Sequence, residues 1–156
     1  MRLVMNKREK IEVLGVELEW KLTADDTNHQ YCVLAATVPP GVGIPPHQHP
    51  DQEAFYVLDG SPEFAFETPL GLDWKRAQPG EMINIPPDTL HGFRNLTDHT
   101  VRVLITCTPN LGRFFEDAGL PIAHDVPRTL APPTPAQIHR VLEIAQRYRQ
   151  RFAPPA

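Results

Sequence analysis

The sequence has few of the features of a secreted, disulfide-stabilised or membrane-inserted protein. Only two of its 156 residues are cysteine, too few for a disulfide framework. No stretch approaches the roughly 18 consecutive apolar residues of a membrane span. The first residues, MRLVMNKREK, lack the apolar core of a secretory signal. We therefore expect no membrane segment and a cytoplasmic location, with Cys32 and Cys107 as reduced, buried side chains.

Positive charge and glycine are also scarce. There are 15 Lys and Arg against 19 Asp and Glu, a formal net charge of −4. Nucleic acids and anionic membrane surfaces attract basic proteins, so we expect neither as a partner. Glycine contributes 9 residues and proline 18, spread along the chain rather than gathered in a tract. This composition indicates many short strands separated by rigid turns.

Between residues 11 and 108, short runs with strand patterning alternate with turn signals. Val16–Leu22 alternates apolar and polar residues, as half-buried strands do. The dipeptide Asp59-Gly60 predicts a hairpin that pairs EAFYVL with PEFAFE. Because no crossover helices separate the runs, the sequence predicts an all-β fold, an antiparallel sandwich or barrel.

After Pro109 the pattern becomes helical. Residues 111–119 resemble a short helix closed by glycine, residues 121–135 a proline-rich extended linker, and Thr134 with Gln137 the capping box of a second helix. One face of that helix is apolar, formed by Ile138, Val141, Leu142, Ala145 and Tyr148. We expect this face to dock on the barrel exterior or on a second subunit. We therefore expect a barrel with N-terminal strands at residues 1–109 and a C-terminal segment at 110–156 packing on it, within a single domain.

Two segments of like construction carry histidines. His47 and His49 are one residue apart, so on a strand both side chains point to the same face. A turn at Pro50-Asp51 then allows Glu53 to face the same space. Residues 80–95 repeat the order of strand, proline turn and histidine, which is His91. A closed antiparallel barrel that receives imidazoles from two such units could form an internal metal site.

These spacings resemble the two motifs of the cupin superfamily. The first motif is matched at every spacing by Gly41, His47, His49, Glu53 and Gly60. The second is matched by Gly80, Pro86, His91 and Asn95, with Asp88 where the family usually has glycine. Aspartate tolerates unusual turn dihedrals better than most residues. The resemblance implies an antiparallel jelly-roll (cupin) barrel with short C-terminal helices, and the metal ligands His47, His49, Glu53 and His91.

Three imidazoles and one carboxylate suit a divalent first-row transition metal ion, and Fe, Mn, Ni, Co, Cu and Zn all remain consistent with this set. Phe55 shares the strand parity of Glu53, and Phe93 and Asn95 share that of His91. All three are predicted to face the interior, where they would contact substrate. For the two phenylalanines, core packing is the alternative.

Three stretches are similar to small single-domain bacterial quercetinases, the flavonol 2,3-dioxygenases: HQHPDQEAFYVLDG, PNLGRFFEDAGLP and the helix ending in EIAQRYRQRF. This likeness implies a dioxygenase that acts on a flavonol-like or other enol or hydroxy-ketone small molecule, with dioxygen as co-substrate and Glu53 as general base. Two alternatives stay open: a non-redox isomerase, decarboxylase, lyase or cyclase, and a small-molecule binding module without turnover.

The resemblance also implies a homodimer, formed through the strand near Val16 and the apolar face of the C-terminal helix. Whether residues 111–125 form a lid over the mouth of the barrel is left open by the sequence.

Overall fold

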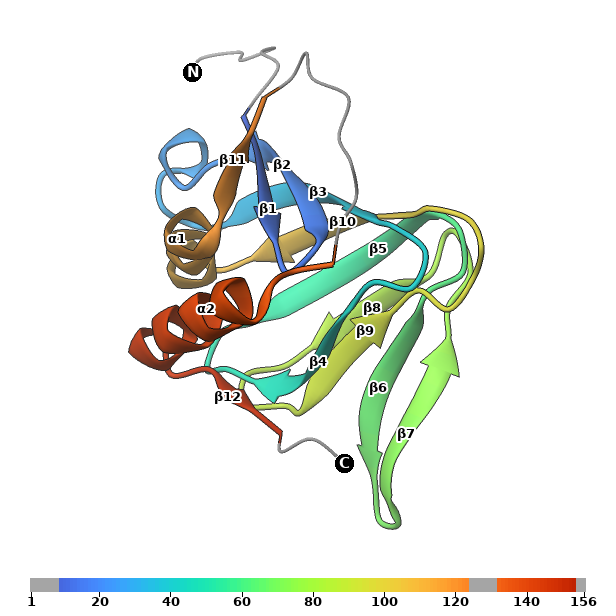
Figure 1. The fold of residues 1–156 in the computed structure, drawn as a ribbon. Helices are drawn as coiled ribbons and strands as arrows, with labels where there is room; N and C mark the ends of the chain where they lie inside the picture. Colours follow the sequence, from blue (N-terminus) through green and yellow to red (C-terminus); the bar gives the residue numbers. More distant parts are fainter. Residues whose placement is uncertain (1–8, 124–131, 154–156) are drawn as a thin grey trace.

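Two antiparallel β-sheets face each other in the computed structural model, which describes residues 9–123 and 132–153 (Figure 1). The larger sheet has the strand order β11-β1-β2-β3-β10-β5-β8. Its strands are β1 Lys10–Val13, β2 Val16–Leu22, β3 Cys32–Val38, β5 Glu53–Asp59, β8 Met82–Ile85, β10 Val101–Cys107 and β11 Leu120–Ile122.

The smaller sheet has the strand order β12-β4-β9-β6-β7. Its strands are β4 Gly43–Gln48, β6 Glu63–Thr68, β7 Gly71–Arg76, β9 His91–Arg94 and β12 Arg151–Phe152. A 3-10 helix at Asp25–Thr27 and the helices α1 Pro109–Ala118 and α2 Pro135–Arg147 complete the described elements. The predicted all-β, antiparallel jelly-roll architecture with short C-terminal helices is confirmed.

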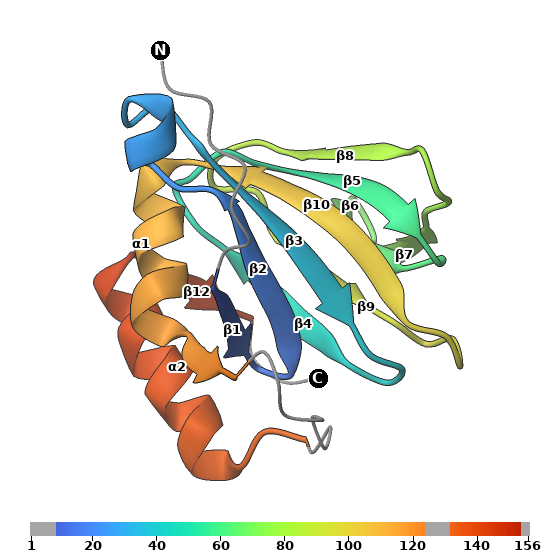
Figure 2. The ribbon, with the colours of Figure 1, turned by 90° about the horizontal axis from the view of Figure 1, so that it is seen from above.

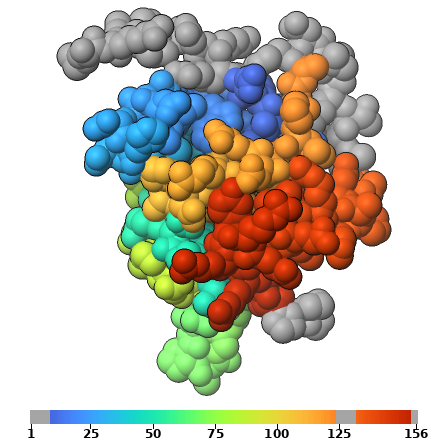
Figure 3. Space-filling model, turned by 90° about the vertical axis from the view of Figure 1, so that its left-hand side faces the viewer, coloured from blue at the N-terminus to red at the C-terminus, as the bar shows by residue number. Residues whose placement is uncertain are grey.

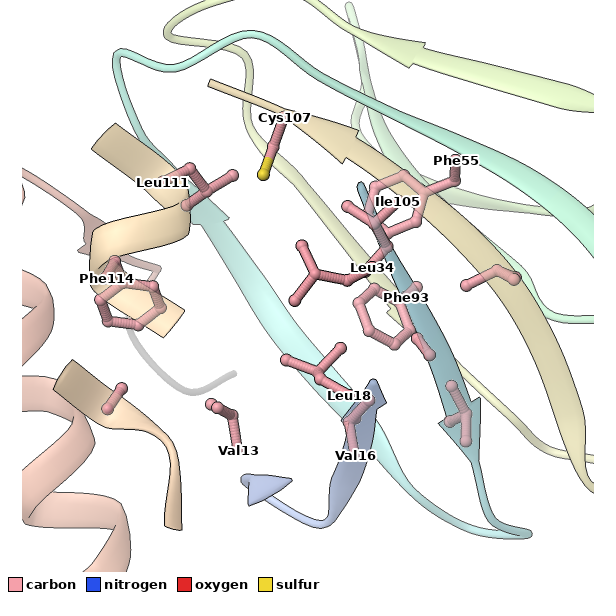
Figure 4. Packing of buried hydrophobic residues seen from close by; sticks show 14 of the residues in the cluster. Val13, Val16, Leu18, Leu34, Phe55, Phe93, Ile105, Cys107, Leu111 and Phe114 are labelled. Atoms are coloured by element: carbon pink, nitrogen blue, oxygen red, sulfur yellow. The ribbon is translucent and has the colours of Figure 1, made fainter. Parts of the chain in front are cut away.

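The core fills the space between the sheets. Strand β10 shows the alternation that produces it: Val101, Val103, Ile105 and Cys107 are buried, and the residues between them are more exposed. Figure 4 shows Leu18, Leu34, Ile105 and Phe93 among the side chains in this space, with Leu111 and Phe114 of α1 at one end. Cys107 and Cys32 are buried free thiols, as predicted.

The predicted hairpin between β5 and β6 is wrong. Strand β5 pairs with β10 on one side and β8 on the other, whereas β6 pairs with β7 and β9 in the other sheet. Because both edges of β5 are occupied, the chain crosses between the sheets after Gly60, which has a φ of 81°. A Cβ on Gly60 would lie 2.8 Å from Val101 Cγ2, so this crossing also needs the absence of a side chain.

Helix α1 begins two residues earlier than predicted, with Thr108 as its N-cap. It ends before Gly119, whose φ of −69° is not left-handed. Glycine is required there for a different reason: a Cβ would lie 2.6 Å from Ile11 Cδ1. The glycine therefore allows the end of the helix to approach β1.

Helix α2 has the predicted capping box of Thr134 and Gln137. Its packed face is shifted from the prediction, because Val141, Ile144 and Ala145 are buried whereas Ile138 is 39% exposed. The first turn of α2, which contains Ile138, extends past the end of α1 (Figure 2).

The predicted extended linker at residues 121–135 overlaps a strand at its start and a helix at its end. Residues 120–122 form β11, which pairs with β1, and residues 124–131 lie outside the described part of the chain. Strand β12 pairs with β4, so the C-terminal segment adds a strand to each sheet. Figure 3 shows α1, α2 and this segment covering one side of the molecule.

The features that suggested a homodimer are internal in this chain. Val16 is 2% exposed, and Val141 and Ala145 of α2 belong to the core cluster. The homodimer stays a prediction. Neither of the two described α-helices is long and apolar enough to cross a membrane.

Candidate metal centre

The four side chains predicted as metal ligands come from neighbouring strands of both sheets. His47 lies on β4 and pairs directly with His91, the first residue of β9. His49 directly follows β4, and Glu53 is the first residue of β5. All four are buried, with 2% to 7% of their surface exposed. The structure therefore brings the predicted set together inside the barrel.

A pair of prolines sets the direction of the first two ligands. The register between β4 and β9 shifts between Ile44 and His47, where Pro45 and Pro46 lie. Proline has no N–H to donate to a neighbouring strand, so the ladder is interrupted at this point. The carbonyl oxygens stay available: Pro45 O accepts from His47 Nδ1 at 2.8 Å, and Pro46 O accepts from Ala153 N at 2.9 Å.

Each imidazole is held by its Nδ1 atom. Nδ1 of His47, His49 and His91 lies 2.8, 3.0 and 2.8 Å from the backbone oxygens of Pro45, Asp51 and Thr89 respectively. A carbonyl oxygen can only accept, so Nδ1 carries the proton and Nε2 presents its lone pair when the ring is neutral. Metal-binding histidines are commonly oriented by such bonds.

The free nitrogen atoms converge. The three histidines each offer a ligand atom within 4.8 Å of the others, the arrangement of a metal site. Nε2 of His91 is buried and has no hydrogen-bond partner among the described residues. A buried nitrogen without a partner is costly unless something binds it, so these residues fit a bound ion.

Glu53 lies beside this group. Its Oε2 atom is 3.1 Å from His49 Nε2 and 3.3 Å from His91 Nε2. The carboxylate is thus placed to be the fourth ligand, and in the protein without an ion it is the hydrogen-bond partner of His49. Three nitrogens and one oxygen suit Fe, Mn, Ni, Co, Cu or Zn, and the donor set does not choose among them.

Burial and neighbouring charges shift the pKa values of His47, His49 and Glu53. Burial lowers the pKa of His47 to about 3, and His91 contributes in the same direction. Burial also acts to lower the pKa of His49, but Glu53 outweighs it and the net pKa is raised. Burial acts to raise the pKa of Glu53, but His49 and His91 lower it to about 2. An ionised Glu53 therefore favours the protonated form of His49, and a divalent cation would compete with that proton.

Asp51 supports the site in a way that the sequence did not reveal. This buried residue accepts hydrogen bonds from Thr108 Oγ1 at 2.7 Å and from Asn110 Nδ2 at 3.1 Å. Its backbone oxygen accepts from His49 Nδ1. Asp51 therefore ties the turn between two ligands to the start of α1. In the sequence it appeared only as a turn residue after proline.

Phe152 is a second residue that sequence reasoning missed. It pairs with His47 in the register of β12 and β4, and the two rings stack at 5.1 Å with an angle of 24° between their planes. The sequence predicts Phe152 at the end of the last helix, but α2 ends at Arg147 and Phe152 lies on β12, so the pattern gave no signal of this contact.

Two cavities border the site. One, of about 50 Å³, is lined by His47, His49 and Glu53, by Gln150, and by apolar side chains that include Phe55 and Phe93. The other, of about 460 Å³, lies among β6, β7 and β8 and reaches His91. It is lined by apolar and polar residues that include Phe64, Phe66, Met82, Lys75, Arg76 and Asn84.

The predicted substrate contacts fall in different places. Phe55 and Phe93 belong to the core cluster and also line the smaller cavity, so both readings of them fit. Asn95 is fully buried but is not among the residues that line either cavity. Its amide donates to Val38 O at 2.9 Å and His99 O at 2.7 Å, which is a structural role. Substrate binding by Asn95 stays a prediction without a geometric basis.

The sequence left open whether residues 111–125 form a lid. Leu111, Phe114 and Phe115 of α1 form part of the wall of the smaller cavity. Residues 124 and 125 lie outside the described part of the chain.

Residues 35–107 match the family model of the cupin domain. The resemblance seen in the sequence is thus confirmed at the level of the superfamily; likeness to quercetinases stays a prediction. No curated protein matches the sequence.

Among solved structures, the polyketide cyclase RemF from Streptomyces resistomycificus has a TM-score of 0.59 and 23% identity, over 70% of this chain and 80% of that one. An oxalate oxidase in complex with glycolate has a TM-score of 0.51 and 20% identity, over 61% of this chain and 51% of that one. The oxalate decarboxylase from Bacillus subtilis has a TM-score of 0.55 and 21% identity, over 65% of this chain and 27% of that one. At these identities the likeness shows the fold alone.

Proposed function

We propose, from a cupin domain over residues 35–107, that this protein is a metal-dependent dioxygenase for a flavonol-like or other enol or hydroxy-ketone small molecule. Its metal ligands would be His47, His49, Glu53 and His91. The observation that carries the proposal is that His47, His49 and Glu53 line a cavity of about 50 Å³, whereas His91 lines a second cavity of about 460 Å³.

The two cavities suit two different reactants. The smaller one holds only a few molecules of water size, since one water needs roughly 10–15 Å³ on this measure. Its wall is almost entirely apolar, which suits dioxygen, and its volume is too small for a ring system. The larger one falls in the range of about 300–1,000 Å³ typical of small-molecule sites. Aromatic Phe64 and Phe66 could contact a planar substrate there, and Lys75 and Arg76 an anionic one.

The chain supplies a base next to the ligand nitrogens. A divalent ion in this position acts as a Lewis acid and lowers the pKa of a substrate hydroxyl. Glu53 would then accept the hydroxyl proton while the bonding electron pair stays on the substrate oxygen, giving an enolate. With a pKa of about 2 in the protein alone, Glu53 is a weak base, so this transfer needs a strongly acidified hydroxyl. His47 stays neutral at all but very low pH and keeps its lone pair for binding.

Oxygen uptake tests the proposal. Protein reconstituted separately with Fe²⁺, Mn²⁺, Ni²⁺, Co²⁺, Cu²⁺ and Zn²⁺ would be mixed with 3-hydroxyflavone and with non-aromatic enols in an oxygen electrode. We expect at least one metal form to consume one dioxygen per substrate and to stop under nitrogen. The demetallated protein is the control. Substrate conversion that continues at the same rate without dioxygen would rule out an oxygenase.

A non-redox metal-dependent reaction is the second candidate, because a carboxylate already lies beside the ligand nitrogens. Glu53 Oε2 is 3.1 Å from His49 Nε2, so next to a bound ion it could move a substrate proton in an isomerase, decarboxylase, lyase or cyclase without dioxygen. A cyclase and a decarboxylase are among the proteins of similar fold. The anaerobic arm of the same assay separates the two candidates. Binding of the substrate without conversion under either condition would indicate a binding module.

A further inference from the structure

We infer that Gln150 is a ligand-binding residue of the smaller cavity, in which its side-chain amide donates a hydrogen bond to an oxygen or nitrogen atom of a small bound molecule. The position of this residue is a property of the fold, whereas the identity of the ligand rests on the proposed function.

The side-chain amide nitrogen of Gln150 is buried without a partner among the described residues. The residue is 5% exposed, and its Nε2 atom has no hydrogen-bond partner among residues 9–123 and 132–153. Buried polar atoms are paired in the great majority of cases, and an exception calls for a bound water or ligand. Gln150 lines the same cavity as His47, His49 and Glu53, where most of the other lining side chains are apolar. Among the lining residues in the described part of the chain, Gln150 alone carries a side-chain amide.

The backbone around Gln150 is arranged to hold it there. Arg149 has a φ of 56°, a left-handed conformation that residues other than glycine adopt at a cost. Directly after this turn, Gln150 N donates to Ala145 O at 3.0 Å. Strand β12 then pairs with β4, where Arg151 faces Gln48 and Phe152 faces His47. These contacts fix the segment on both sides of Gln150.

The strand period explains why this side chain points inward. Side chains two residues apart on an extended chain lie on one face, so Gln150 shares the face of Phe152 rather than that of the exposed Arg151. Phe152 stacks on His47 and lines the same cavity. Gln150 and His49 line this cavity as well.

The size of the cavity and the chemistry of the amide limit the ligand. About 50 Å³ admits a diatomic molecule, a small anion or a polar substituent of a larger substrate. An N–H donor favours a ligand that has a hydrogen-bond acceptor atom. Because the amide is neutral, the ligand need not be charged. Water, dioxygen and an enolate oxygen share this chemistry. Gln150 would therefore decide which small ligands remain bound in an otherwise apolar space.

Azide binding to the Co²⁺-loaded protein tests the inference. Azide is small, has terminal nitrogen acceptors and changes the visible spectrum of protein-bound Co²⁺ when it binds. We expect Gln150→Met to weaken azide about tenfold or more, the cost of losing a hydrogen bond to a charged group. The matched control is Gln146→Met, which changes an exposed glutamine of α2 and should leave the affinity unchanged. The Co²⁺ spectrum without azide should be the same in all three proteins.

The thermal stability of the metal-free protein is the second readout. Methionine has a similar shape and removes an unpartnered donor, so Gln150→Met should leave Tm unchanged or raise it by about 2–4 °C. A residue that only packs would give the opposite pattern, with a lower Tm and unchanged azide affinity, and either result overturns the inference. Failure of the wild-type protein to bind Co²⁺ would instead overturn the proposed function, and the Tm comparison would then decide the role of Gln150 alone.

Discussion

The buried imidazole of His47 should make the metal-free protein less stable as the pH falls from 7 to 5. Its pKa is about 3 in the folded protein, against an ordinary value of 6.5, because burial opposes the charged form. Between these two values the unfolded chain binds a proton that the folded chain does not bind. Stability contributed by neutral His47 is therefore present above pH 6.5 and is lost progressively as the pH falls towards 3.

The expected loss can be worked out from the two pKa values. With 6.5 unfolded and about 3 folded, the free energy of unfolding falls by about 2 kcal/mol between pH 7 and pH 5. His49 acts in the opposite direction, since its raised pKa adds stability that is full below 6.5 and lost as the pH rises through its folded value. Glu53 has a lowered pKa, and its stabilisation is lost only below its ordinary value of 4.5, outside this window.

Urea unfolding at pH 7 and pH 5, with chelator present, gives the measurement. We expect the wild-type protein to lose about 2 kcal/mol more than His47→Gln over this interval. His139→Gln, at a position with 75% of the side chain exposed, is the control and should behave as wild type. Adding a saturating metal ion should not abolish the pH dependence of the wild-type protein, because folded His47 is deprotonated with or without the ion and only the unfolded chain takes up the proton. Identical pH dependence in wild type and His47→Gln would refute the reasoning.

Three further substitutions test individual contacts. Glu53→Gln should keep measurable metal binding by elemental analysis but abolish turnover, and normal turnover would show that Glu53 is not the base. Gly92→Ala should lower the free energy of unfolding by about 1–3 kcal/mol in urea titrations, because a Cβ there would lie 2.9 Å from Ile44 O and 3.0 Å from Pro46 N; an unchanged midpoint would contradict the close packing of β4 on β9. Phe152→Ala should weaken metal binding about 10–100-fold in competition with a chromophoric chelator, because it removes the ring that holds His47. Equal affinity would show that His47 needs no such support.

The parts of the site that follow from strand parity and turn chemistry could be predicted from the sequence. His47 and His49 lie one residue apart, so their convergence needed only an extended chain, and Glu53 and His91 followed from the motif spacings. Asp88 was expected to tolerate an unusual turn conformation, and it has a φ of 59°. Within each motif, these features depend on residues close together in the sequence.

Features that depend on distant parts of the chain could not be predicted. The Asp59-Gly60 signal gave a turn but not the partner of β5, because β10 and β8 compete for the edges that a hairpin would use. The contacts of Asp51 with α1 and of Phe152 and Gln150 with the cavity join segments about 60 to 100 residues apart. No local pattern marks such residues, since each contact exists only after both sheets and α2 have assembled.

The central claim is that His47, His49, Glu53 and His91 bind one transition metal ion inside the barrel. Elemental analysis of purified protein, compared with His49→Ala and His91→Ala, tests it most directly. We predict close to one first-row transition metal ion per wild-type chain after incubation with excess metal and gel filtration, and a small fraction of that in either variant, with circular dichroism showing that both variants remain folded. Wild-type protein that retains no ion, or folded variants that retain as much as wild type, would contradict the account.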